Sequence, residues 1–446
     1  MRQSIVLMAL LSACANGPPP PAAYQAGGDP ELLHAAVLQL TDVIVYDILS
    51  PPQASRAYAY ASIAAYEAVR PAHPGQRTLA GQVRGLTPLP EPAAGADYNY
   101  PLAATHAFLV VGRALTFSHD RLDTTRVQLE APLRSRLSRA VFERSIAYGD
   151  TVAQRILAWA AKDNYLQMRG YPKFTVTAEP GRWRPTPPAY MDAVEPYWNR
   201  IRPLVLDSAA QFRPQAPYRF DLKPGSQFYK EAREVYDVGR NLSAEQRAIA
   251  AFWDCNPYVM HVQGHTMFAT KKITPGGHWM GIVAIAARQA HADFMRSAEA
   301  YARTAIALNE GFITVWDEKY RSNVIRPETV INAYIDERWE PLLQTPPFPE
   351  YTSGHSGIST AASIVLTDEF GDNFGFTDDV EKAYGLPARS FTSFKQAAAE
   401  AAISRLYGGI HYRHAIEQGQ VQGRHVGELV VQRIQTKNAV ATTASF

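Results

Sequence analysis

Two separated segments in the C-terminal half hold side chains of the types that bind oxyanions. Lys319 and Arg326 stand seven residues apart, which is about two helical turns, so both side chains could point the same way. Further along the chain, Ser353-Gly354-His355 stands where a segment of small and apolar residues begins. A helix start exposes unpaired amide N–H groups and the positive end of the helix dipole, and glycine lets an anion approach the backbone closely. The two segments therefore indicate an anion site with an imidazole beside it.

A third segment places another imidazole after a helix end. The helix that carries Ser404 and Arg405 is predicted to end at Gly408-Gly409, and a new helix is predicted to start after His411. Taken alone, each segment has an ordinary interpretation. Cationic pairs usually lie on solvated helix faces, serine is a common N-cap, and histidine often caps a helix end. The chemical interpretation depends on all three segments occurring in one chain.

Together the three segments are similar to the signature of the vanadium-dependent haloperoxidase and type-2 phosphatidic acid phosphatase superfamily. The signature reads Lys-x6-Arg-Pro, then Ser-Gly-His, then Ser-Arg-x5-His, and it is filled here by Lys319, Arg326, Pro327, Ser353, Gly354, His355, Ser404, Arg405 and His411. Residues 252–257 and 275–279 also resemble the bacterial haloperoxidase branch of this superfamily. Residues 29–225 share only a helical character with it.

The resemblance implies that the site binds vanadate as its cofactor, with neither haem nor flavin. Phosphate is a near-isosteric tetrahedral anion that could occupy the same site. The residues implied to bind the anion are Lys319, Arg326, Ser353, Gly354, Arg405 and His411. His411 would bind vanadium through a ring nitrogen, and the three cations would neutralise the charge of the anion.

The resemblance also implies catalytic roles for three side chains. His355 would act as acid and base, Lys319 would polarise peroxide so that halide can attack it, and His411 would anchor the vanadium. The partners would be hydrogen peroxide and a halide, with an organic acceptor left open. In a phosphatase with the same site, His411 would instead be the nucleophile that forms a phospho-enzyme.

Three functions stay open on these residues: a haloperoxidase that oxidises halide to hypohalous acid, an acid phosphatase of the type-2 phosphatidic acid phosphatase kind, and a non-catalytic lipoprotein that binds phosphate-like anions. Two histidines beside three cations favour an enzyme. Ala415 stands four residues after His411, where many members of the superfamily have an Asp that is implied to orient the histidine in phosphatases. The absence of that Asp favours the haloperoxidase, and it leaves open what orients His411. Thr352 replaces a Pro that often precedes the Ser, outside the implied anion contacts.

Aromatic residues are predicted to line a halide pocket. Phe348 stands seven residues before His355, where chloroperoxidase-like members have an aromatic residue and bromoperoxidases have a histidine, so an apolar pocket is favoured. Trp253 and Tyr258 are further candidates for its lining. Ordinary core packing is the alternative role for each of these rings.

Helical periodicity dominates the elements that must position these residues. Helical patterns are predicted at about 100–118, 130–163, 227–240, 243–256, 279–311, 327–338, 355–370, 393–408 and 415–435. Strand-like alternation is almost absent, and the Pro-rich and aromatic stretch 171–224 is irregular. These patterns predict an all-α fold of two packed helical bundles with long irregular connections. The expected parts are an N-terminal helical region at 29–225, a C-terminal catalytic region with the oxyanion site at 226–436, and a flexible tail at 437–446.

The first residues resemble a bacterial lipoprotein signal. Arg2 precedes an apolar run that ends in Leu11-Ser12-Ala13-Cys14, which predicts a signal peptide at 1–13 and lipidation of Cys14. The Pro- and Gly-rich residues 14–28 would form a tether. The expected location is the bacterial cell envelope, in the periplasm or at the outer-membrane face, with the membrane as a partner through the lipid. Cys255 would then be the remaining thiol, so no intramolecular disulfide is expected.

The charge composition does not favour nucleic acid as a partner. The net charge is +2, and Lys and Arg are scattered among Asp and Glu rather than gathered into a basic segment. A zinc site at His261 and His265, which are four residues apart, is a weak alternative. The Glu that usually follows the first His of such a pair is Val262 here.

Overall fold

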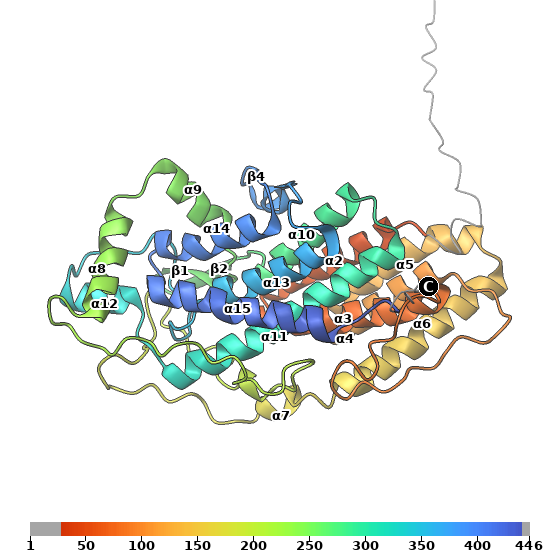
Figure 1. The fold of residues 1–446 in the computed structure, drawn as a ribbon, viewed down its shortest axis with the longest axis horizontal. Helices are drawn as coiled ribbons and strands as arrows, with labels where there is room; N and C mark the ends of the chain where they lie inside the picture. Colours follow the sequence, from red (N-terminus) through yellow and green to blue (C-terminus); the bar gives the residue numbers. More distant parts are fainter. Residues whose placement is uncertain (1–27, 439–446) are drawn as a thin grey trace, which may run out of the picture.

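The computed structural model describes residues 28–438 and is mostly helical (Figure 1). Within this part of the chain, the strands form two small two-stranded antiparallel sheets. The all-α prediction is therefore confirmed. The predicted signal peptide at 1–13, Cys14, and nearly all of the tether lie outside the described residues, as do residues 439–446 of the expected tail. Across residues 28–438, no helix combines the length and the hydropathy needed to cross a membrane.

The N-terminal part of the chain forms a layer of helices followed by a long irregular stretch. Its elements are α2 (Glu31–Asp47), α3 (Pro51–Val69), η1 (Arg70–Ala72), α4 (Tyr100–Ala114), α5 (His119–Arg136), α6 (Arg139–Ala160), α7 (Tyr165–Met168) and η2 (Trp198–Arg200). Ser50 starts α3 with a capping box, because its hydroxyl accepts from the Gln53 amide while the Gln53 side chain accepts from the Ser50 amide. Figure 1 shows α5 and α6 at the end of the molecule away from α8 and α12.

The C-terminal part supplies the central helices and both sheets. Its elements are α8 (Gln227–Arg240), α9 (Ala244–Phe252), β1 (Val259–Gln263), β2 (Thr266–Thr270), α10 (Pro275–Gln289), α11 (Phe294–Ser322), α12 (Pro327–Tyr334), α13 (Gly354–Phe370), β3 (Phe376–Asp378), η3 (Val380–Tyr384), β4 (Arg389–Phe391), α14 (Phe394–Tyr407) and α15 (Arg413–Arg433). Helix α11 is buried around nearly its whole circumference and packs against α3, α10, α13 and α15. One hydrophobic cluster extends from Leu33 to Ile434, so the two predicted regions share a core.

Close packing between α13 and α15 fixes the start of α13, and glycine makes that packing possible. Gly419, Gly423 and Gly427 follow one another at four-residue spacing on one side of α15. A Cβ added to Gly419 would lie 2.7 Å from the carbonyl oxygen of Ser353, and one added to Gly423 would lie 2.1 Å from that of Gly357. Any larger side chain at these positions would push the two helices apart. The N-terminus of α13 is therefore held directly against α15.

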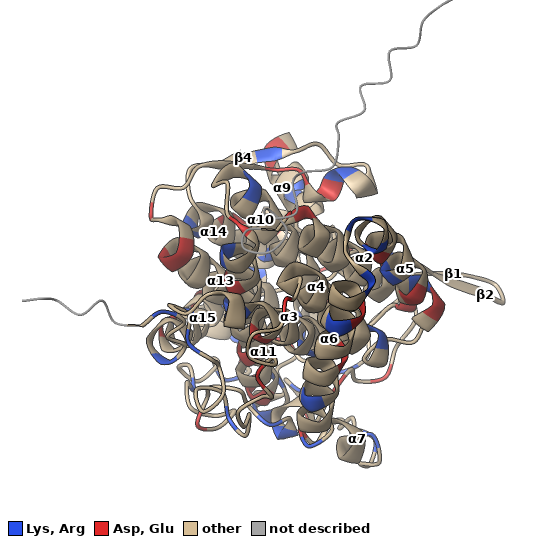
Figure 2. Ribbon diagram, turned by 90° about the vertical axis from the view of Figure 1, so that its right-hand side faces the viewer, with Lys and Arg blue, Asp and Glu red and all other residues tan. Residues whose placement is uncertain are grey.

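Besides the segment 130–163, which is divided between α5 and α6 with Ser138 as the N-cap of α6, two elements differ from the sequence expectation. The segment 279–311 was expected as one helix, but α10 ends at Gln289 and α11 begins at Phe294 and continues to Ser322. The break comes where His291 adopts a left-handed conformation, with φ of 49°, and Asp293 caps α11. The second difference is the β1–β2 hairpin, which projects from the body of the molecule in Figure 2 and turns at Gly264 with φ of 58°. His261 lies on β1 and His265 lies in the turn, so the two do not share a helix face.

The irregular stretch between the helical layers is anchored to α11 by a buried carboxylate. Glu310 accepts hydrogen bonds from the amides of Leu204, Val205 and Leu206, at 2.8, 2.9 and 2.6 Å. Three backbone donors of a non-helical segment are satisfied in this way inside the core. At the other end of the chain, Lys437 pairs with Gln76 as an isolated bridge. The first residue of the expected tail is therefore bound to the N-terminal layer.

Candidate active site

The three segments singled out in the sequence meet at one buried position. Lys319 lies near the end of α11, and Arg326 is the N-cap of α12. The pair does not share a helix, because α11 ends at Ser322 and Asn323 turns the chain with φ of 49°. The other implied anion ligands lie at the start of α13, near the end of α14, and in the turn before α15; they are Ser353, Gly354, Arg405 and His411.

Lys319 is fully buried and bound by main-chain carbonyls. Its ammonium group donates to the carbonyl oxygens of Pro349, Glu350 and Thr352, at 3.0, 3.0 and 2.6 Å. Burial, with Arg326 close by, holds the pKa of Lys319 well below its usual value. Three acceptors nevertheless match the three N–H bonds of a charged ammonium group. Lys319 therefore holds the loop 349–352, which precedes α13, through its main-chain carbonyls.

Arg326 is fully buried, and one nitrogen of its guanidinium group has no hydrogen-bond partner among the described residues. Its Nε donates to the carbonyl oxygen of Phe348 at 2.8 Å, and its Nη1 donates to that of Ile410 at 2.9 Å. Nη1 also lies 3.2 Å from Nε2 of His411. Among the described residues, the buried Nη2 has no hydrogen-bond partner. Burial lowers the pKa of Arg326 to about 10, so the guanidinium group stays charged at neutral pH.

His411 is oriented by Glu350, which the sequence analysis did not single out. Oε1 of Glu350 lies 2.7 Å from Nδ1 of His411 and accepts from the amide of Tyr412 at 3.0 Å. Nδ1 therefore carries the ring proton, and the lone pair of Nε2 faces Arg326. Burial lowers the pKa of His411 well below its usual value and raises that of Glu350 to about 8. The only sequence signal was an acidic residue three positions before Ser353.

This contact changes the argument drawn from Ala415. The lack of an acid at position 415 counts against a phosphatase only if no other acid orients His411. Glu350 supplies that acid from a different loop. Ala415 contributes its carbonyl oxygen instead, which accepts from the amide of Ser353 at 3.0 Å. Ala415 therefore does not distinguish the two reactions.

The start of α13 has the predicted form. Ser353 is the N-cap, and its hydroxyl oxygen accepts from the amide of Ser356 at 3.3 Å and from the hydroxyl of Ser356 at 2.8 Å. In the first turn, Nε2 of His355 is buried and has no hydrogen-bond partner among the described residues. Burial, and secondarily Arg405, hold the pKa of His355 well below its usual value. The imidazole is therefore neutral, with a nitrogen free to accept a proton.

A narrow cavity opens at these residues. Its polar lining includes Gly354, His355, Arg405 and His411, and its aromatic lining consists of Tyr258, Phe312, Trp316 and Phe348. Two of the three predicted halide-pocket residues, Phe348 and Tyr258, therefore border the cavity. The ring of Trp253 instead stacks on His278, with centroids 4.7 Å apart. Only the main chain of Trp253 reaches the site, where its carbonyl oxygen accepts from Nη2 of Arg405 at 2.6 Å.

The residues present fit a tetrahedral oxyanion. Nη2 of Arg326 and Nε2 of His355 are buried polar atoms without protein partners, and each is able to bind an oxygen of such an anion. Three cations, Lys319, Arg326 and Arg405, surround the site, and Glu350 is the acidic residue that contacts it. An anion would therefore offset positive charge that the described protein groups leave unbalanced. The start of α13 adds backbone donors on the same side.

Comparisons with known proteins identify the family of the chain. A family model described as the VCPO second helical-bundle domain matches residues 299–439. The crystal structure of the first bacterial vanadium-dependent iodoperoxidase is 54% identical, with a TM-score of 0.88, covering 92% of this chain and 98% of that chain. The holo and apo forms of a bacterial vanadium-dependent chloroperoxidase are each 18% identical, with TM-scores of 0.67 and 0.66, and cover 87% and 88% of this chain and 93% and 94% of theirs. At that identity they show a shared fold alone.

No curated protein matches the chain. The likeness to the iodoperoxidase nevertheless covers nearly the full length of both proteins. The family model covers the segments that carry the residues around the anion site, which we call the vanadate cage: Lys319, Arg326, Ser353, Gly354, Arg405 and His411. The chain therefore belongs to the bacterial vanadium-dependent haloperoxidases, enzymes that use vanadate and hydrogen peroxide to oxidise halide ions.

Proposed function

We propose that the halide oxidised by this enzyme is iodide. The observation that carries the proposal is the 54% identity, over 92% of the chain, with a bacterial iodoperoxidase. The aromatic wall of the cavity supports it. Iodide is the largest and most weakly hydrated of the common halides, so moving it from water to an apolar wall costs the least desolvation. Iodide is also the halide that is oxidised most easily.

In this proposal, the cage binds vanadate through one ring nitrogen and several hydrogen bonds. Nε2 of His411 is the ligand atom, because Nδ1 is already bonded to Glu350. The unpartnered Nη2 of Arg326 and the donors of Ser353 and Gly354 at the start of α13 bind oxygens, and Arg405 adds positive charge at the cavity. When bound, vanadate supplies a Lewis acid that activates peroxide toward attack by halide.

His355 and Lys319 act on the reacting groups in different ways. The free Nε2 of His355 takes up the proton that hydrogen peroxide loses on binding, and His355 later returns a proton to the departing oxygen. Lys319 does not line the cavity, because its three N–H bonds are directed at the carbonyls of the loop 349–352. Its charge polarises peroxide across that loop, and its contacts hold the loop in place.

Halide preference tests the proposal. With vanadate-loaded protein at a fixed peroxide concentration, kcat/KM for iodide is expected to exceed that for bromide and chloride by at least about tenfold, which corresponds to about 1.4 kcal/mol in barrier height. Phe348→His puts a polar ring in the same wall. It is expected to lower the ratio of kcat/KM for iodide to kcat/KM for bromide. Bromide or chloride oxidation as fast as that of iodide would overturn the assignment.

We also propose that a lipid on Cys14 anchors the mature chain to the cell envelope. The support is the sequence alone, since Cys14 lies outside residues 28–438: an apolar run ends at Cys14, and a Pro- and Gly-rich stretch follows it. Cys14→Ser is expected to move the protein from the membrane fraction to the soluble fraction and to remove the lipid from its intact mass. An unmodified wild-type chain in the soluble fraction would contradict the proposal.

A further inference from the structure

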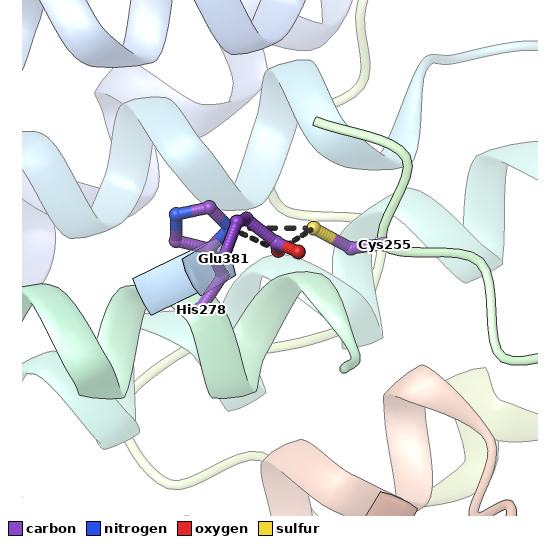
Figure 3. A group of neighbouring side chains, drawn as sticks. All are labelled: Cys255, His278 and Glu381. Carbon is purple, nitrogen blue, oxygen red and sulfur yellow. Dashed lines mark hydrogen bonds and ion pairs between the residues drawn. The ribbon is translucent and has the colours of Figure 1, made fainter. Parts of the chain in front are cut away.

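A second group of side chains lies next to the active site and takes no part in the vanadate cage. It consists of Cys255, which follows α9, His278 in the first turn of α10, and Glu381 on η3 (Figure 3). All three side chains are buried. Sγ of Cys255 lies 3.4 Å from Nδ1 of His278 and 3.7 Å from Oε1 of Glu381, and the nitrogen and the oxygen are 3.0 Å apart. Three donor atoms from three separate segments therefore converge on one point.

The triangle formed by these atoms has the size of one face of a zinc coordination tetrahedron. Zinc–sulfur distances of ~2.3 Å and zinc–nitrogen and zinc–oxygen distances of ~2.0–2.2 Å place tetrahedral donors about 3.3–3.6 Å apart. The observed separations run from 3.0 to 3.7 Å. Small side-chain adjustments would bring all three atoms to bonding distance of a single ion.

The other nitrogen of His278 has the partner that a metal-binding histidine usually has. Its Nε2 lies 2.8 Å from Oδ2 of the fully buried Asp378, on β3. Oδ1 of the same carboxylate accepts from the amide of Val380 at 3.1 Å. A carboxylate on the remote ring nitrogen fixes the ring orientation and makes the other nitrogen a better ligand. This arrangement leaves Nδ1 directed at the cysteine and the glutamate.

We propose that Cys255, His278 and Glu381 bind a divalent transition metal, with zinc the best fit, at a site distinct from the vanadate cage. Thiolate, imidazole and carboxylate are the three ligand types that zinc accepts, and they leave one coordination position for water. Binding releases the thiol proton of Cys255 to solvent water, so a sulfur–metal bond replaces a sulfur–hydrogen bond with no change in oxidation state. Glu381 also borders a second cavity, which none of the vanadate cage residues lines and which provides a path for the ion.

The metal would fix one wall of the active site. Cys255 lies two residues after Trp253, whose carbonyl oxygen accepts from Arg405, and Cys255 itself borders the vanadate cavity. The ring of Trp253 also stacks on His278. One ion would therefore join the segment after α9 to α10 and η3, and would hold the carbonyl that orients Arg405. The role proposed for the metal is structural.

Metal content and cobalt spectroscopy test the proposal on the full-length protein. Purified wild-type protein, washed with a weak chelator, is expected to retain about one zinc ion per chain by mass spectrometry. Replacing zinc with Co²⁺ is expected to give the near-ultraviolet absorption of a cobalt–thiolate bond. The chain has two cysteines, so Cys14→Ser is the matched control that keeps the band, whereas Cys255→Ser should abolish it. His261→Gln, on the exposed hairpin, should keep both the metal and the band.

A second variant covers the case in which Cys255→Ser does not fold. Glu381→Gln keeps the size of the side chain and the cobalt–thiolate band, and it is expected to weaken zinc binding by at least about tenfold, because a neutral amide replaces a charged ligand. Folded wild-type protein that retains no zinc and shows no band with cobalt would overturn the proposal, since the three side chains would then form a hydrogen-bonded cluster only. Equal zinc affinity in wild type and Glu381→Gln would also overturn it.

Discussion

His355→Ala is expected to lower the turnover of peroxide-dependent halide oxidation by a factor of ~10²–10⁴, the range contributed by a positioned acid–base group. Vanadate affinity should fall far less than turnover, because His355 can offer the anion one hydrogen bond, whereas His411 is assigned as the cofactor ligand. The physical basis is the buried Nε2 of His355, which has no partner among the described residues. Steady-state kinetics beside equilibrium dialysis with vanadate would separate the two effects.

The pH profile provides the control for this assignment. Burial lowers the pKa of His355 well below 6.5, the usual value for an imidazole, so the neutral form that accepts a proton persists into acidic solution. The acidic limb of kcat/KM is therefore expected below pH 6.5 in the wild type and absent in His355→Ala. A limb at or above 6.5, or equal turnover in the two proteins, would contradict the role of His355.

His411→Ala is expected to cause the largest loss of vanadate affinity of any single substitution in the cage. It removes the ligand atom and leaves only charge and hydrogen bonds to bind the anion, so the loss should exceed the ~10–100-fold that removal of a supporting partner costs. Equilibrium dialysis with vanadate measures it directly. Equal affinity in wild type and His411→Ala would rule out His411 as the ligand.

Two variants of Glu350 test, by the same measurement of vanadate affinity, whether this side chain orients His411. Because burial raises the pKa of Glu350 to about 8, the side chain is largely protonated at pH 7, and Glu350→Gln should orient His411 nearly as well. Glu350→Ala removes the acceptor for Nδ1 of His411 and for the amide of Tyr412. That change is expected to cost ~10–100-fold in vanadate affinity. Similar losses in the two variants would contradict the orienting role.

The sequence was sufficient to predict those parts of the site whose structure depends on neighbouring residues. Ser353 was identified as a helix N-cap, and the glycines before His411 as a helix end, because capping and glycine conformation depend on neighbouring residues. The order of the three segments then indicated the family. The all-α fold followed from helical periodicity in the same way.

The features of the site that the sequence did not predict depend on contacts between segments far apart in the chain. Glu350 meets His411 across sixty-one positions of sequence, and no local pattern marks that pairing. Cys255 was interpreted only as a remaining thiol, because His278 and Glu381 reach it from two other elements. The position of Lys319 beneath the loop 349–352 also required the fold, since the helix that carries it ends before Arg326.

The most direct test of the central claim uses the purified full-length protein stripped of bound anions. Halide oxidation with hydrogen peroxide is expected to be absent at first, to rise with added vanadate, and to saturate as the cage fills. Hydrolysis of a phosphate ester should remain the slower reaction in the vanadate-loaded protein. Ester hydrolysis that proceeds without vanadate, is inhibited by it, and exceeds halide oxidation would contradict the assignment of this chain as a vanadate-dependent haloperoxidase.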